Sequence, residues 1–142
     1  MNLADANLLL YAYDAGSQRS VSAREWLEEQ LNGSEPFALA WASIHAFLRI
    51  ATHSSVFVRP LAIAEAIGAV DSWLMQPAVH VLEPGPRYWS ILQKLLIEAQ
   101  VRGNLVSDAH LAALAIEHGA TLCTTDRDFT LFPGLRLLDP VS

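Results

Sequence analysis

The amino-acid sequence predicts an α/β fold, a three-layer α/β/α sandwich around a central parallel sheet. Helix-like and strand-like segments alternate along the 142-residue chain. The strand-like segments are short, continuous apolar runs, and they lack the polar alternation of strands that expose one face to water. Runs of this kind are typical of a parallel sheet that helices cover on both faces.

The composition predicts a single folded domain over residues 1–142. Hydrophobic residues make up 52% of the chain and charged residues 17%, a balance that permits a full core and excludes disorder. No apolar run approaches the roughly 18 residues of a membrane span, and Asp5 interrupts the segment where a signal peptide would be apolar. We therefore expect a soluble, cytoplasmic protein without membrane contact. The single cysteine, Cys123, is expected to be a buried structural residue.

The first 75 residues are expected to form two strands and four helices. Apolar runs predict the strands, and apolar residues spaced by three or four positions predict the helices. Ser20 is the expected N-cap of the second helix, which Asn32-Gly33 ends. The apolar stripe of the fourth helix consists of Ile63, Ile67, Val70 and Leu74. The strands are 1–4 and 37–40, and the helices are 7–13, 21–31, 42–52 and 61–75.

The rest of the chain is expected to form three strands and two helices. Pro84-Gly85-Pro86 and Gly103-Asn104 flank the first of these helices, and Gly119 is the expected C-terminal cap of the second. The second helix is almost wholly apolar after Asp108, which predicts that it is buried. Residues 126–128 form an acidic turn. The strands are 79–82, 121–124 and 135–138, and the helices are 88–101 and 107–118.

The net charge of −6 argues against passive binding to nucleic acid, because phosphates attract clusters of Lys and Arg. A nucleic-acid substrate would therefore require a metal ion or local arginines. Four aspartates bear on this point, and without them the remaining 11 acidic residues nearly balance the 9 basic ones. They are Asp5, Asp108, Asp126 and Asp128.

These four aspartates are expected to meet at one edge of the sheet. Asp5 ends the first strand, Asp126 and Asp128 follow the fourth, and Asp108 begins the helix that leads into that strand. Two bare carboxylates about 4 Å apart repel by roughly 4 kcal/mol, so the cluster requires protonation, arginine partners or a divalent cation. Oxygen ligands alone favour Mg²⁺ or Mn²⁺. Taken singly, Asp108 also suits a structural role at a helix N-terminus, and Asp126 and Asp128 suit a turn. Asp5 has no such simple alternative, because it interrupts an apolar run.

Four motifs lie in order along the chain. They are Asp5-Ala-Asn7-Leu-Leu-Leu-Tyr-Ala, Phe47-Leu-Arg49-Ile-Ala-Thr52, Ser107-Asp108-Ala-His-Leu-Ala-Ala-Leu-Ala and Thr124-Thr-Asp126-Arg-Asp128-Phe129. Together they resemble the PIN-domain ribonucleases of the VapC toxin type over essentially the whole chain. The resemblance implies an endoribonuclease that depends on Mg²⁺, with Mn²⁺ as a substitute, and that acts as the toxin of a toxin-antitoxin pair. It also implies a VapB-type antitoxin partner, an RNA substrate and a homodimer.

The resemblance also assigns roles to individual residues. Asp5, Asp108 and Asp126 match the catalytic metal ligands, and Asp128 is a further candidate ligand. Asn7 and Thr125 match positions that support the acidic ring. Arg49 is a candidate to pair with the acids or to bind phosphate, and His45 is a candidate phosphate contact. The larger set of candidates is thus Asp5, Asn7, His45, Arg49, Asp108, Thr125, Asp126 and Asp128.

One position departs from the family pattern and leaves an alternative open. Many members carry a glutamate directly before the Phe-Leu-Arg stretch, where this chain has Ala46. The alternative is a catalytically weak PIN-fold module that binds RNA or protein. Of the four tryptophans, Trp26, Trp73 and Trp89 lie on apolar helix faces and are expected to pack in a core or interface. Trp41 ends a strand beside the expected site, where a base-stacking role is also conceivable.

Overall fold

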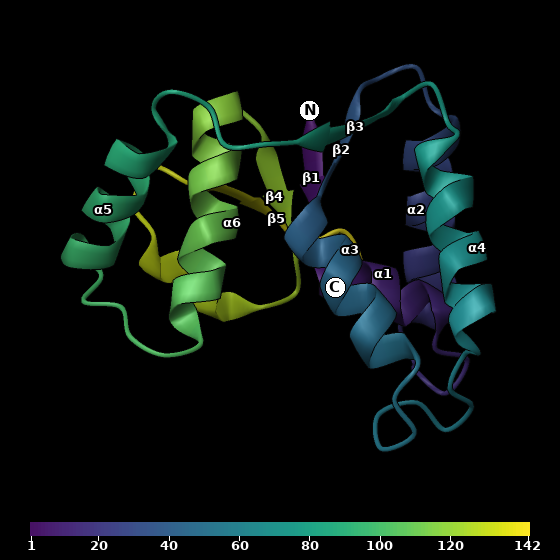
Figure 1. The fold of residues 1–142 in the computed structure, drawn as a ribbon. Coiled ribbons are helices and arrows are strands. Elements are labelled where there is room, and N and C mark those ends of the chain that lie inside the picture. Colours follow the sequence, from purple (N-terminus) through teal and green to yellow (C-terminus); the bar gives the residue numbers. More distant parts are fainter.

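The protein is described by a computed structural model that covers residues 1–142, and it has a five-stranded parallel sheet at its centre (Figure 1). The strand order is β3-β2-β1-β4-β5, so the first strand lies in the middle. Strand β1 pairs with β2 on one side and with β4 on the other, in parallel register. The strands are β1 (Asn2–Ala4), β2 (Phe37–Ala40), β3 (Val79–Leu82), β4 (Thr121–Cys123) and β5 (Arg136–Leu138).

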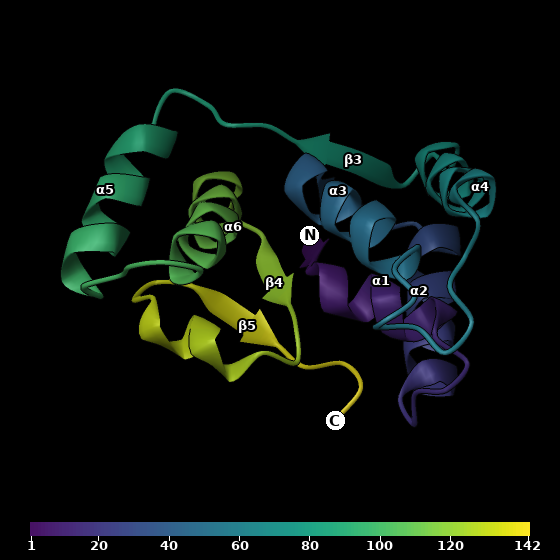
Figure 2. The same ribbon diagram turned by 60° about the horizontal axis from the view of Figure 1, so that its bottom comes forward.

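Six α-helices cover the two faces of the sheet, which confirms the predicted α/β/α sandwich. Buried residues of α1, α2, α3 and α4 form the core on one face, and those of α5 and α6 form the core on the other. Figure 2 shows the two helix groups on opposite sides of the strands. The helices are α1 (Ala6–Tyr13), α2 (Ser20–Asn32), α3 (Trp41–Ala51), α4 (Ile63–Leu74), α5 (Tyr88–Glu98) and α6 (Leu105–His118). None of these helices is long and apolar enough to cross a membrane.

The apolar strands are explained by burial on both faces. Successive side chains of a strand point to opposite sides, so Leu3 packs in the core with α6 while Ala4 packs in the core with α1. All four residues of β2 are fully buried for the same reason. Strand β5 differs, because it lies at the sheet edge and its residues are exposed. Gly119 has a left-handed φ of 67° and ends α6, as the sequence predicts.

Several local predictions are wrong. Ser20 is a buried residue inside α2, and Arg19 takes the N-cap position without a side-chain hydrogen bond. The predicted stripe of α4 is mostly on the surface, because Ile63 is 58% exposed and Ile67 48%. Its buried residues are Ala66, Val70 and Trp73.

Trp89 lies outside both cores, which leaves an interface as the other place expected for it, and the acidic turn forms more structure than expected. Trp89 is 62% exposed, whereas Trp26 and Trp73 are buried as predicted. Residues Arg127–Leu131 form a short 3₁₀-helix, η1, directly after the acidic turn begins. Helix α6 begins two residues earlier than the predicted 107 and α5 ends three residues before the predicted 101. Cys123 is buried, and burial raises the pKa of its thiol to about 12, as suits a structural residue.

The crossover from β3 to α5 is fastened to the end of α6 by Glu117. One carboxylate oxygen of Glu117 accepts the backbone N–H of Gly85 at 2.7 Å, and the other accepts that of Arg87 at 2.9 Å. The Arg87 guanidinium in turn donates to the backbone carbonyl of Glu117 at 2.7 Å. A Cβ on Gly85 would lie 2.7 Å from the Glu117 carboxylate, so only glycine fits this contact without a shift.

Candidate active site

Asp5 is held where β1 ends and α1 begins, at the centre of the sheet. Its backbone N–H donates to the carbonyl of Cys123 in β4 at 2.9 Å. One carboxylate oxygen caps α1 by accepting the N–H of Ala6, and the other accepts the Thr124 hydroxyl, each at 2.7 Å. Burial raises the pKa of Asp5, the two hydrogen bonds oppose this rise, and the charge of Asp126 adds to it.

Thr124 links the residues on both sides of the site. Its hydroxyl donates its single proton to Asp5 and accepts the Asn7 side-chain amide at 3.2 Å and the N–H of Asp126 at 3.0 Å. The Asn7 amide also donates to the Thr125 hydroxyl at 2.9 Å. Since the Thr124 proton is already used, the NH₂ group of Asn7 must face the threonines. The structure thus brings Asn7 and Thr125, both predicted as supports, into one network with Asp5.

This network continues to the surface. The Tyr11 hydroxyl lies 3.4 Å from the Thr125 hydroxyl and accepts Arg19 at 3.1 Å. The Arg19 guanidinium also lies over the Tyr11 ring, 5.3 Å from its centroid. Neither Tyr11 nor Arg19 was expected at the site. The sequence offers one indication of them: Tyr11 lies one helical turn after Asn7, so the two side chains share a helix face.

The other three aspartates form a compact group. Carboxylate oxygens of Asp108, Asp126 and Asp128 lie within 4.8 Å of one another. Asp126 is fixed in place because it accepts the backbone N–H of Asp128 at 2.9 Å as the cap of η1. Partial burial, together with the charges of Asp126, Asp5 and Asp128, raises the pKa of Asp108 from 3.8 to about 6.

No basic group neutralises this acidic cluster. The ion pairs of the chain are Lys94 with Glu98 and His118 with Glu117, and neither involves the four aspartates. Arg49 therefore does not pair with the acids, and that part of its expected role is wrong. Repulsion among the carboxylates must be relieved by protonation or by a cation. An all-oxygen set of carboxylates suits a hard divalent ion such as Mg²⁺ or Mn²⁺.

Asp5 and Asp108 also share a small pocket of about 150 Å³. Its walls include one face of α3, with Ala42, Ser43 and Ala46. Position 46, where many family members carry a glutamate, therefore does face Asp5 and Asp108. The methyl group of Ala46 leaves this part of the pocket open.

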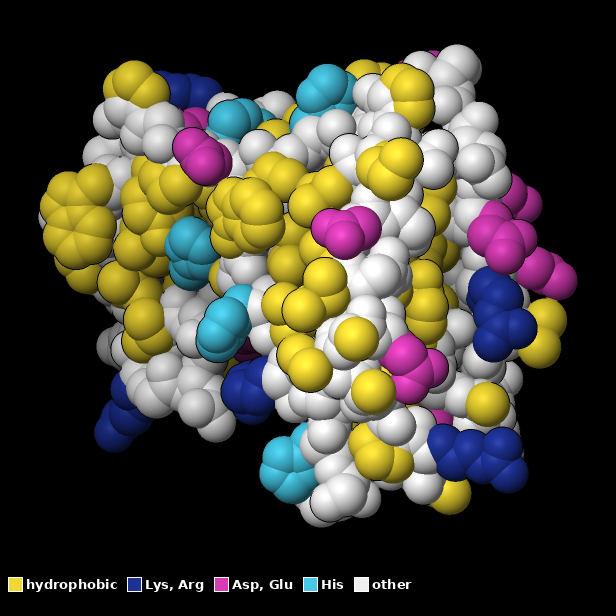
Figure 3. All heavy atoms as spheres, turned by 45° about the vertical axis from the view of Figure 1, so that its right-hand side comes forward, with side chains coloured by type: hydrophobic (Ala, Val, Ile, Leu, Met, Phe, Trp, Pro, Cys, Tyr) yellow, Lys and Arg dark blue, Asp and Glu magenta, His cyan; other side chains and the backbone are white.

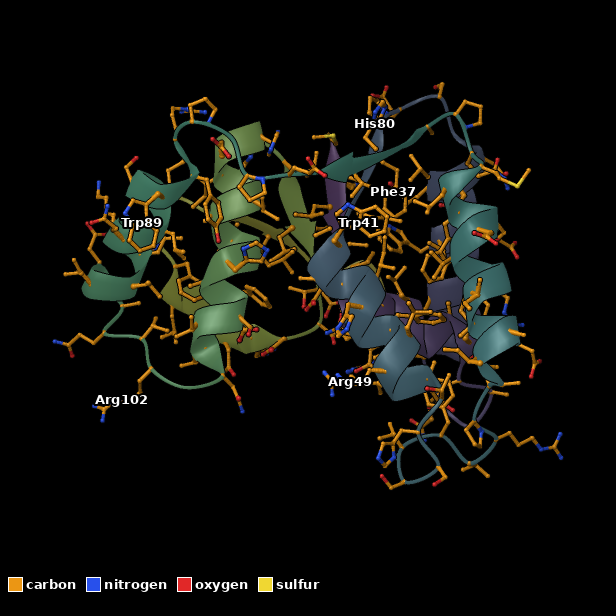
Figure 4. The ribbon with its side chains drawn as sticks, viewed as in Figure 1. Phe37, Trp41, Arg49, His80, Trp89 and Arg102 are labelled. Carbon is orange, nitrogen blue, oxygen red and sulfur yellow. The ribbon has the colours of Figure 1, made fainter.

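Arg49 and His45 are both exposed on α3, and Figure 4 shows Arg49 in the C-terminal part of that helix. Arg49 lies three residues after Ala46 and seven after Ala42, so it shares their face of α3 and lies beyond the pocket on the same side. His110, which follows Asp108 by two residues on α6, contacts α5, because the Tyr88 hydroxyl lies 2.5 Å from its Nδ1. This contact supports a structural role for His110.

Comparisons with known proteins show the family and agree with the fold. The model of the PIN domain matches residues 3–135. The chain is 40% identical to ribonuclease VapC37 of Mycobacterium tuberculosis over 99% of this chain and 97% of that protein. It is 38% identical to ribonuclease VapC33 of the same species over 99% of both chains. The fold matches one chain in the crystal structure of VapBC2 from Rickettsia felis bound to a promoter DNA fragment, with a TM-score of 0.72, 18% identity and 96% coverage of both chains.

Proposed function

Because the chain belongs to the PIN-domain family and, within it, to the VapC ribonucleases, we propose that its acidic cluster binds Mg²⁺ and cleaves RNA. The chain is an endoribonuclease of the toxin-antitoxin type, since its relatives over almost the full length are VapC ribonucleases and its fold matches that of one chain of a toxin-antitoxin complex. The observation that supports the metal site is the group of three carboxylates within 4.8 Å of one another without a basic partner. Mn²⁺ is expected to substitute for Mg²⁺, since both prefer oxygen ligands.

We assign the ligand roles to Asp5, Asp108, Asp126 and Asp128. A divalent cation, when bound, lowers the pKa of a water and offsets charge at the attacked phosphorus. Asp108, Asp126 and Asp128 converge on one point, while Asp5 faces the pocket that it shares with Asp108. Thr124 holds Asp5 in one orientation through its hydroxyl. The catalytic set is Asp5, Asp108 and Asp126, and no protein nucleophile is required.

Arg49 and His45 are the proposed contacts to the RNA backbone. Both are exposed on α3, and Arg49 lies on the helix face that lines the acidic pocket. Arg49 forms no ion pair within the chain, so its guanidinium is free for a phosphate. Arg49 provides a local positive charge for RNA that the overall charge of −6 does not, and His45 offers a ring nitrogen for a hydrogen bond.

The proposed partners are a VapB-type antitoxin and a second copy of the chain. The acidic cluster has no internal basic partner, so it can accept an arginine from an antitoxin, which would compete with the cation. For the homodimer, Trp41 and Trp89 offer exposed apolar area on α3 and α5, as labelled in Figure 4. Figure 3 shows hydrophobic and histidine side chains gathered together on the surface. We place the activity in the cytoplasm, where RNA is available.

Cleavage of a labelled RNA by the purified chain tests the assignment. Asp5→Asn and Asp108→Asn should each lose most of the Mg²⁺-dependent cleavage, about a hundredfold or more. Asp71→Asn, which changes an exposed aspartate of α4, is the matched control and should cleave like the wild type. Full activity in both site variants would refute the assignment. The alternative, an inactive binding module, is not favoured, because the full-length relatives are ribonucleases.

A further inference from the structure

Ser43 differs from the other buried polar side chains of the protein. Three polar residues are buried, namely Ser20, Ser43 and Thr124. Ser20 accepts a hydrogen bond from Arg24 at 3.4 Å, and Thr124 is bonded to Asp5, Asn7 and Asp126. The Ser43 side chain is only 3% exposed and forms no hydrogen bond with the protein, but its hydroxyl is not sealed from solvent, because Asn7 Oδ1 is the one sealed side-chain atom without a partner. The Ser43 hydroxyl therefore opens into the pocket that it lines, where its hydrogen-bond partner is water.

The surroundings of Ser43 indicate the role of that water. Ser43 lines the same pocket as Asp5 and Asp108, and its hydroxyl is not among the side-chain atoms sealed from solvent. The other α3 residues of the pocket, Ala42 and Ala46, carry only methyl groups. Ser43 is therefore the one polar side chain that α3 presents to the two acids.

We infer that the Ser43 hydroxyl is a metal-positioning group, which donates a hydrogen bond to water in the coordination shell of the cation. This inference rests on the proposed metal dependence. Mg²⁺ and Mn²⁺ sites commonly keep several waters and use few protein carboxylates, so they need neighbouring groups that hold those waters. A pocket of about 150 Å³ has room for a few waters, each of which takes about 30 Å³ in the liquid.

Position 43 also explains how the site functions without an acid at position 46. The two residues are three apart on α3 and line the same pocket. A glutamate side chain at position 46 would add a charge to an acidic cluster that has no basic partner. The Ser43 hydroxyl instead contributes a neutral donor, which holds water without further repulsion. Ser43 is thus a positioning residue and does not contact the cation directly.

Calorimetric titration of the full chain with Mn²⁺ tests this role. Ser43→Ala should bind Mn²⁺ about tenfold more weakly than the wild type, the usual effect of losing an outer contact to a metal site. Ser22→Ala, which changes an exposed serine of α2 without a hydrogen bond, is the matched control and should bind like the wild type.

Thermal unfolding separates this role from a purely structural one. In EDTA, Ser43→Ala should melt at or above the wild-type temperature, because the lost hydroxyl has no protein partner. With saturating Mn²⁺, the rise in melting temperature should be smaller for Ser43→Ala than for the wild type. If the wild type binds Mn²⁺ but Ser43→Ala binds it within twofold, the Ser43 inference is wrong and the metal site stands. If the wild type does not bind Mn²⁺, both are wrong.

Discussion

The raised pKa of Asp108 leads to the prediction that Asp108→Asn stabilises the metal-free protein at neutral pH. Asp108 lies with Asp126 and Asp128 in a group without a basic partner, so its ionisation costs folding free energy. A rise in the pKa from 3.8 to about 6 corresponds at most to about 3 kcal/mol. Because Asp108 is only partly buried, solvent screening should reduce this cost to about 1 to 2 kcal/mol.

The sign of this effect depends on pH. Between pH 3.8 and about 6, folded Asp108 binds more protons than unfolded Asp108, so the stability of the metal-free wild type falls as the pH rises through this range. The asparagine side chain has nearly the same shape and no charge. The extra stability of Asp108→Asn over the wild type should therefore be absent below pH 3.8 and complete above about pH 6.

Thermal unfolding in EDTA measures the effect. At neutral pH, Asp108→Asn should melt about 3 to 6 °C above the wild type, since about 1 kcal/mol shifts the melting temperature of a chain this size by about 3 °C. Asp71→Asn, the exposed control, should melt with the wild type. With Mg²⁺ added, only proteins that retain Asp108 should gain stability. If Asp108→Asn melts at or below the wild type in EDTA at neutral pH, the repulsion inferred for this cluster is refuted.

Three further substitutions test the support of Asp5, the contact to RNA and the fastening of the β3–α5 crossover. Thr124→Val removes the donor to Asp5, so cleavage should fall about tenfold, as measured with a labelled RNA; unchanged cleavage would mean that Asp5 needs no such support. Arg49→Ala should raise the KM for RNA several-fold with little change in kcat, and it should weaken the salt dependence of RNA binding. A fall in kcat of the same size would contradict a pure binding role for Arg49. Glu117→Gln should lower the melting temperature at neutral pH. Burial would raise the pKa of Glu117, but hydrogen bonds from the backbone of Gly85 and Arg87 hold that pKa below 4.5. The loss in melting temperature should therefore shrink as the pH falls below 4.5, because the wild-type carboxylate becomes protonated. A difference that does not change with pH would exclude the charge of Glu117 as its cause.

The sequence predicts the elements and a gathering of aspartates at one sheet edge because both follow from chain-wide rules. Three of the four aspartates come within 4.8 Å of one another, and Asp5 shares a pocket with one of them, Asp108. Continuous apolar runs indicate parallel strands, and the carboxyl ends of such strands meet at one edge of the sheet. Asp5 after β1 and Asp126 after β4 become neighbours because those two strands pair in register. The order of the strands does not need to be known in detail for this prediction.

The choice between helix faces cannot be made from spacing alone. Helix α4 carries two apolar stripes, one with Ile63 and Ile67 and one with Val70 and Trp73. The second stripe is buried because Trp73 packs against Phe47, with ring centroids 4.8 Å apart, and donates its indole N–H to the Tyr13 hydroxyl at 3.1 Å. These partners come from α1 and α3, so only tertiary contacts decide which stripe is in the core.

Thr124 and Ser43, two supporting residues of the site, could not be predicted from the sequence for a similar reason. Thr124 looks like an ordinary strand residue, and its role depends on a hydrogen bond to Asp5, which lies 119 positions away. Ser43 looks like a helical serine, and only its place on the wall of the acidic pocket distinguishes it. By contrast, Asn7 and Thr125 could be predicted because they belong to motifs that resemble those of the family.

RNA cleavage with and without a divalent cation tests the central proposal most directly. The purified chain is incubated with a labelled RNA in EDTA and then with an excess of Mg²⁺. Since the three clustered carboxylates have no basic partner, the proposal predicts no cleavage in EDTA and full cleavage after Mg²⁺ is restored. Cleavage that proceeds equally well in EDTA would contradict it.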